Sequence, residues 1–160
     1  MTLFAYAFNL GIHPDFWSAP PGLGSLGVVV ALYLVAAGLA LLGRRLLSRK
    51  ATRWTPPTQL LLAAPMIAAA PIVDLMSWRS AGFDPQLSSQ AALVHAFLSQ
   101  QGLLGAICAV MALYMAARAS RGLITAPRNN SFDMVTIFIV YTAVQGCATA
   151  VLTRSVALAL

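Results

Sequence analysis

The side chains able to do chemistry in this chain are few, and two of them stand near one edge of its apolar stretches. Asp74 is the one acid inside such a stretch, and His95 lies at the start of the next one. Asp74 is expected about 6 Å below Trp78, near the outer surface of a bilayer rather than at its midplane. An acid and a histidine that meet there are suited to a proton relay or to substrate coupling. The alternative is a structural pair, with Arg79 as another partner for the acid, and the shallow depth favours it.

Further polar side chains follow the third and fourth apolar stretches at helical spacing. In a lipid environment they would be left without hydrogen-bond partners, so they are expected to face protein. The candidate intramembrane or packing residues are Asp74, His95, Ser99, Gln101, Tyr141 and Gln145. On the third stretch His95 and Ser99 continue into a stripe of small residues at Gly102, Ala106 and Ala109, and on the fourth Tyr141 and Gln145 share a face with Thr149. We expect these two stripes to pack together, with the first stretch at the outer edge.

Ligands for metals and haem are scarce. A haem held by two histidines needs both of them at matching depths on facing helices. The chain has only His13 and His95, and His13 precedes every apolar stretch, so the two cannot form such a pair. Metal sites built from His, Cys and carboxylates meet the same shortage. Cys108 and Cys147 stand on different stretches without the paired spacing of redox cysteines, which predicts two buried thiols. The residues therefore predict no catalytic group, no metal ligand and no cofactor bound by this chain.

The spacing of the charges defines the elements that carry these residues. Hydrophobic residues make up 59% of the 160-residue chain and charged residues only 9%, and the charges fall almost entirely between four apolar stretches. About 20 apolar residues at 1.5 Å per residue match a hydrocarbon core of about 30 Å. The sequence therefore predicts an all-α integral membrane protein, a bundle of four transmembrane helices within residues 24–160, with spans at about 24–43, 60–78, 91–117 and 132–152.

The basic residues predict an orientation. Most of them lie in the two segments 44–53 and 118–128, whereas Arg79 and Arg154 are left for the opposite side. By the positive-inside rule these two basic loops face the cytoplasm, and both termini face the outer, periplasmic side of a bacterial inner (plasma) membrane. The net charge of +6 is explained by these loops and indicates no nucleic-acid partner.

Residues 1–23 precede the first span. They lack the basic start of a signal peptide, and Asn9, His13 and Asp15 interrupt their apolar run. Their aromatic residues are of the kind that anchor a chain at the membrane interface. We therefore expect an outer-face segment suited to an interfacial helix.

The second half of the chain resembles a known family on a series of short motifs. They read Asp84-Pro85, Val94-His95-Ala96-Phe97, Gln101-Gly102, Met111-Ala112-Leu113-Tyr114-Met115-Ala116-Ala117-Arg118, Arg121-Gly122-Leu123, Pro127-Arg128, Ser131-Phe132-Asp133 and Tyr141-Thr142-Ala143-Val144-Gln145-Gly146. This order is similar to the C-terminal helices of haem-copper terminal oxidase subunit III, as found in fused subunit I+III chains. There a helix with an early His ends in an Ala- and Arg-rich turn, and a short basic loop leads to the last helix. With the stretch from Trp54 through Asp74, the resemblance covers residues 54–152.

The resemblance implies a non-catalytic accessory subunit of a bacterial respiratory terminal oxidase, either a cytochrome c or a quinol oxidase, in the electron-transport chain. It implies a subunit I-like partner that holds haem and copper and that this chain packs against and stabilises, together with bound phospholipid. A usual subunit III has more spans and carries buried Glu residues. This chain has no Glu, so any role of those residues is not carried over.

Two other interpretations stay open. The first is an accessory or assembly subunit of another hetero-oligomeric membrane complex. The second is a small transporter or quinone-linked enzyme that uses Asp74 and His95. Membrane lipids are expected partners in every case.

Overall fold

The chain forms four long helices. The computed structural model describes residues 21–48, 55–86, 89–124 and 130–158, and every regular element within them is helical. The helices are α2 (Leu23–Ser48), α3 (Thr55–Ser80), α4 (Ser89–Ser120) and α5 (Asn130–Leu158), and all four are long and apolar enough to cross a membrane. This confirms the predicted all-helical fold with four helices of a length and composition suited to crossing a membrane. The expected interfacial segment falls largely on residues 1–20, and parts of the basic loops fall on 49–54 and 125–129, all outside the described residues.

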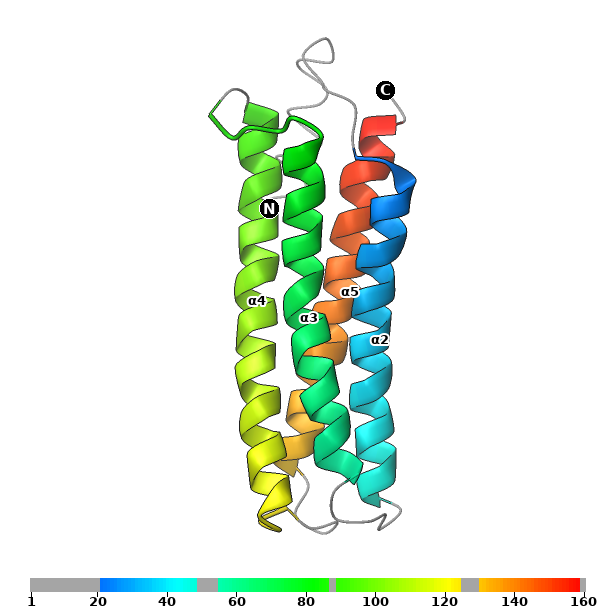
Figure 1. The fold of residues 1–160 in the computed structure, drawn as a ribbon, viewed down its shortest axis with the longest axis vertical. Helices are drawn as coiled ribbons and strands as arrows, with labels where there is room; N and C mark the ends of the chain where they lie inside the picture. The colour runs from blue at the N-terminus through cyan, green and yellow to red at the C-terminus, as the bar shows by residue number, and fades with distance from the viewer. Residues whose placement is uncertain (1–20, 49–54, 87–88, 125–129, 159–160) are drawn as a thin grey trace.

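The helices run alternately up and down and form one bundle (Figure 1). We call the end where α3 finishes the Trp78 end, and the opposite end, where α2 finishes, the Arg44 end. Each helix packs chiefly on two neighbours, in the ring α2–α3–α4–α5. The α2–α3 and α3–α4 contacts are the most extensive, and the contact between α4 and α5 is the least extensive of the four.

The first span is not an outlying helix. Tyr33, Ala36 and Ala40 of α2 are buried, and α2 packs on both α3 and α5. The span that we expected at the outer edge therefore packs on two neighbours, although its buried share, 28%, is the smallest of the four. Its small side chains, which let helix backbones approach closely, are used inside the bundle.

Two glycines end helices α3 and α4 in the same way. Gly82 has φ 84° and Gly122 has φ 74°, a conformation that costs a glycine little. After α3, Phe83 N–H donates to the carbonyl of Trp78 at 3.2 Å. After α4, Leu123 N–H donates to the carbonyl of Arg118 at 3.1 Å. These are Schellman caps, which satisfy the last helical carbonyls and turn the chain out of the helix.

The α3–α4 contact depends on a proline and a glycine. Pro71 lies inside α3 and has no N–H, so it leaves the carbonyl of Ile67 without its helical donor. Gly105 of α4 packs directly against this carbonyl, since a Cβ built on Gly105 would lie 2.9 Å from the Ile67 oxygen. Only a residue without a side chain fits there without a shift of one helix.

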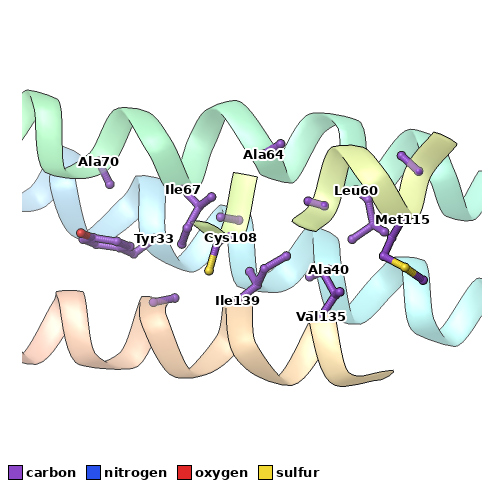
Figure 2. Close-up of a cluster of buried hydrophobic side chains, with 14 of the residues drawn as sticks. Tyr33, Ala40, Leu60, Ala64, Ile67, Ala70, Cys108, Met115, Val135 and Ile139 are labelled. Carbon is purple, nitrogen blue, oxygen red and sulfur yellow. The ribbon is translucent and has the colours of Figure 1, made fainter. Parts of the chain in front are cut away.

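The core is built from small and aliphatic side chains of all four helices. Figure 2 shows Tyr33, Leu60, Ile67, Cys108 and Ile139 pointing into the space between them. A Cβ built on Gly146 of α5 would overlap the ring of Tyr33, so the glycine provides the surface on which this ring lies. A second cluster at the Trp78 end is formed by Trp78, Phe83, Ala91, Val94, Phe97 and Leu98.

Candidate functional site

An ion pair buried between α3 and α5 is the most polar feature of the bundle interior. Arg154 Nη2 donates a hydrogen bond to Asp74 Oδ1 at 2.6 Å, and the two side chains are only 1% and 6% exposed. Both residues lie toward the Trp78 end, because α3 and α5 finish there. These helices make few backbone contacts with each other, so the long arginine side chain is what joins them across the ring.

The remaining donors of the arginine are partly satisfied by its surroundings. Ser77 Oγ accepts a second bond from Arg154 Nη2 at 3.1 Å and donates to the carbonyl of Asp74 at 2.7 Å. Arg154 Nη1 donates to the carbonyl of Ala150 at 3.2 Å. Arg154 Nε is buried and has no partner among the described residues.

Aromatic rings close this site toward the Trp78 end. The guanidinium of Arg154 lies 5.3 Å from the centroid of the Trp78 ring, in reach of a cation–π interaction. Trp78 meets Phe83 edge to face, with centroids 4.7 Å apart. Trp78 Nε1, like Arg154 Nε, is buried without a partner among the described residues.

This geometry suits a structural contact between two helices better than a pair of reacting groups. The charges of Asp74 and Arg154 neutralise each other, and neither side chain is open to solvent or to a ligand. Removing one member of such a pair leaves an uncompensated buried charge, which costs about 3–5 kcal/mol. The pair therefore holds α3 and α5 at one relative height.

His95 makes no hydrogen bond or ion pair with Asp74 or Arg154 among the described residues. Its Nδ1 lies 2.9 Å from the carbonyl oxygen of Ala91, one turn earlier on α4. Its Nε2 is buried and has no partner among the described residues. Arg79, the other expected partner of the acid, is exposed on the last turn of α3. The structure thus gives Asp74 a partner on α5 in place of either residue.

The other polar candidates are distributed over the surface and the interior. Gln101 is buried and Gln145 is half-buried, and the Oε1 atoms of both are buried without a partner among the described residues. Ser99 and Tyr141 are exposed on the outside of the bundle. The expected stripe through Ser99 is therefore not the buried face of α4, which instead runs through Gln101, Gly105, Cys108 and Ala112. Since a helix turns by about 100° per residue, this face lies beside the predicted stripe.

Arg154 is the functional residue that the sequence interpretation missed, because it was counted only as a charge that orients the chain. A signal was present. Ile139, Ala143, Ala150 and Arg154 share one face of α5 at helical spacing, and this is the face that α5 buries. A basic residue at the end of a buried stripe is a natural partner for an acid inside another span.

A second ion pair ties the Arg44 end. Arg44 Nε donates to Asp133 Oδ1 at 2.9 Å, and the side chains are 48% and 24% exposed. Asp133 lies in the first turn of α5, where the helix dipole favours an acid. This pair joins the end of α2 to the start of α5.

Neither cysteine belongs to a cluster. Cys108 is buried and donates to Thr142 Oγ1 at 3.3 Å, and Cys147 is half-buried rather than fully enclosed. Within the described ranges no three His, Cys, Asp or Glu side chains lie close enough together to hold a metal ion.

Comparison with known proteins adds no relative. No family model matches the chain, and no curated protein or solved structure is significantly similar to it.

Proposed function

We propose that the chain is a non-catalytic accessory subunit of a bacterial respiratory haem-copper terminal oxidase that packs against the catalytic subunit and stabilises it. The resemblance of residues 54–152 to the C-terminal helices of subunit III is the ground for naming this complex. Haem and copper then belong to the catalytic partner, and phospholipid fills the rest of the surface. The electron donor is cytochrome c or quinol.

The observation that carries the non-catalytic role is the pairing of Asp74 with Arg154. A transporter or a proton relay needs an acid that exchanges ions or protons with water. Asp74 instead shares a short hydrogen bond with a buried arginine, and its side chain is 6% exposed. An acid held in this way supports a structural role.

In the proposed orientation the Arg44 end faces the cytoplasm and the Trp78 end faces the periplasm. Arg44, Arg45, Arg118 and Arg121 lie at or near the Arg44 end, as the positive-inside rule requires of a cytoplasmic side. Arg118 also lies 5.7 Å from the centroid of the Tyr114 ring, and such aromatic and basic pairs are typical of a membrane interface.

Deletion of the gene tests the proposal. Membranes of the deletion strain should lose oxidase activity together with the reduced-minus-oxidised haem bands of the assembled oxidase, and the wild-type gene should restore both. Asp74→Asn should lower the amount of assembled complex without changing the turnover of each complex that forms. Unchanged haem bands and activity in the deletion strain would contradict an oxidase role. A substrate flux that Asp74→Asn abolishes at normal protein levels would favour the transporter instead.

A further inference from the structure

The polar groups on the outer surface of the bundle are unevenly distributed. Along residues 26–43 of α2, the one polar side chain is Tyr33, which is buried. Along residues 60–76 of α3, the one polar side chain is Asp74, which is also buried. The exposed faces of these two helices are therefore entirely apolar over their middle parts, as surfaces that contact acyl chains must be.

Helices α4 and α5 differ from this pattern. Gln100 of α4 is exposed, and Tyr141 of α5 is 58% exposed. Gln145 follows Tyr141 by one turn and is half-buried. Tyr141 stands near the middle of α5, far from the interfacial depth at which exposed tyrosines are usual.

These polar groups gather along the α4–α5 seam, which we define as the line where Cys108 contacts Phe138 and Thr142. Cys108 Sγ lies 3.3 Å from Thr142 Oγ1 and 3.8 Å from the carbonyl oxygen of Phe138. An α-helix turns by about 100° per residue. Going around α5 from Phe138 toward the outside of the bundle, Gln145 comes first and Tyr141 next. Both lie on the side of α5 away from Gly146, which contacts α2.

The same geometry holds on α4. Gly105 marks the side of α4 that meets α3. Gln100 and Ile107 lie on the opposite side of Cys108, turned by about 80–100° toward α5 and the outside. The seam is thus bordered by Gln100 and Ile107 on one helix and by Tyr141 and Gln145 on the other, and it is the least tightly packed of the four helix contacts.

The seam also exposes a polar group that lacks a partner. The Tyr141 side chain is 58% exposed and its hydroxyl has no hydrogen-bond partner among the described residues, whereas Gln145 Oε1, which is also unpaired, is enclosed by this chain. Acyl chains offer neither donors nor acceptors, and an unpaired polar group in hydrocarbon is costly. Side chains of a neighbouring helix meet this need, and hydrogen bonds of this kind are common between transmembrane helices.

We infer that the α4–α5 seam is the surface by which this chain binds a transmembrane helix of a different subunit. That helix presents hydroxyl or amide side chains at the depth of Tyr141 and Gln145, so that the exposed Tyr141 hydroxyl is paired. The inference rests on the proposed function in that it takes the partner to be another subunit of the same complex. The apolar faces of α2 and α3 remain in contact with lipid.

Photo-crosslinking in native membranes tests the inference. The probe p-benzoylphenylalanine replaces Ile107, which is 40% exposed at the seam and leaves Tyr141 and Gln145 intact. The matched control carries the same probe at Leu34 on α2, which is 61% exposed. We expect the Ile107 probe to give one discrete product with another subunit, mapped by peptide sequencing to a transmembrane segment that contains Ser, Thr, Asn or Gln. The Leu34 probe should give mainly lipid adducts.

Variants that remove the polar groups test the chemistry at this surface. Tyr141→Phe with Gln145→Leu should lower the crosslinking yield of the Ile107 probe by roughly threefold to tenfold. Ser99→Ala is the control, because Ser99 is also an exposed polar residue of α4 but lies on the side of the helix opposite to Cys108 and the seam. Its yield should be unchanged.

Each remaining outcome bears on one of the two proposals. Products with a second copy of this chain, or lipid adducts from the seam, would overturn the inference. A partner crosslinked from Leu34 and not from Ile107 would overturn it while leaving a multi-subunit complex standing. A seam partner that belongs to a complex without haem would uphold the inference and contradict the oxidase.

Discussion

Arg154 on α5 and Asp74 on α3 form a buried ion pair, with Nη2 and Oδ1 2.6 Å apart, between helices whose backbones make few contacts. The pair is the main polar tie across the ring. At the other end of the bundle, Arg44 and Asp133 form a pair of similar length, 2.9 Å, that is open to solvent. Two pairs of similar geometry in such different environments should contribute very differently to stability.

The buried pair gives the first prediction. Asp74→Asn or Arg154→Met should each lower the free energy of unfolding by about 3–5 kcal/mol, because each leaves a buried charge or polar group without its partner. Denaturation in mixed detergent micelles measures this loss. The double variant Asp74→Leu/Arg154→Met should recover most of it, since neither charge then remains. Losses that simply add in the double variant would contradict a coupled pair. Arg79→Met, at an exposed site on the same helix, is the control.

The exposed pair gives the second prediction. Arg44→Ala should lower the free energy of unfolding by less than about 1 kcal/mol, because the Arg44 side chain is 48% exposed and water screens the interaction. Raising the salt concentration should remove even this effect. A loss of unfolding free energy as large as that of Arg154→Met would show that solvent exposure does not make the two ion pairs differ in their contribution to stability.

The contact between Gly146 and the Tyr33 ring gives the third prediction. Gly146→Ala should destabilise the bundle by about 1–3 kcal/mol, because the added methyl group overlaps the ring and forces α2 and α5 apart. Thermal denaturation in detergent measures the change. Gly38→Ala is the matched control, since a Cβ there meets no atom within 4 Å. Combining Gly146→Ala with Tyr33→Leu should cost less than the sum of the two changes, and strict additivity would argue against the contact.

The four helices were predictable from the sequence because hydropathy and charge spacing act along one span at a time. The position of Asp133 in the first turn of α5 was predictable for the same reason, since helix caps and dipoles are local. Neither prediction requires knowledge of how one helix is turned against another.

The pairing of Asp74 and the buried face of α4 were not predictable in this way. Both depend on the rotation and relative height of neighbouring helices. In α4 small residues occur on two adjacent stripes, and packing against the part of α3 around Ile67 and Pro71 selects the stripe through Gly105, because only glycine fits against the Ile67 carbonyl. Arg154 follows Asp74 by eighty positions in the chain, and only the folded bundle brings the two together.

The orientation of the bundle gives the fourth prediction. In a background of Cys108→Ala and Cys147→Ala, a membrane-impermeant maleimide added to intact spheroplasts should label Gln86→Cys and leave Arg121→Cys unlabelled. Both positions are exposed, one near the Trp78 end and one near the Arg44 end. Permeabilised cells, in which both should react, are the control. The reverse pattern would contradict a periplasmic Trp78 end.

Purification of the tagged chain in a gentle detergent tests the central claim most directly. The preparation is examined by a reduced-minus-oxidised optical spectrum and by mass spectrometry of whatever accompanies the chain. A subunit of a terminal oxidase should bring with it haem bands and a larger multi-span partner in fixed proportion. A colourless preparation that contains this chain alone, from membranes in which the complex is intact, would contradict the proposal.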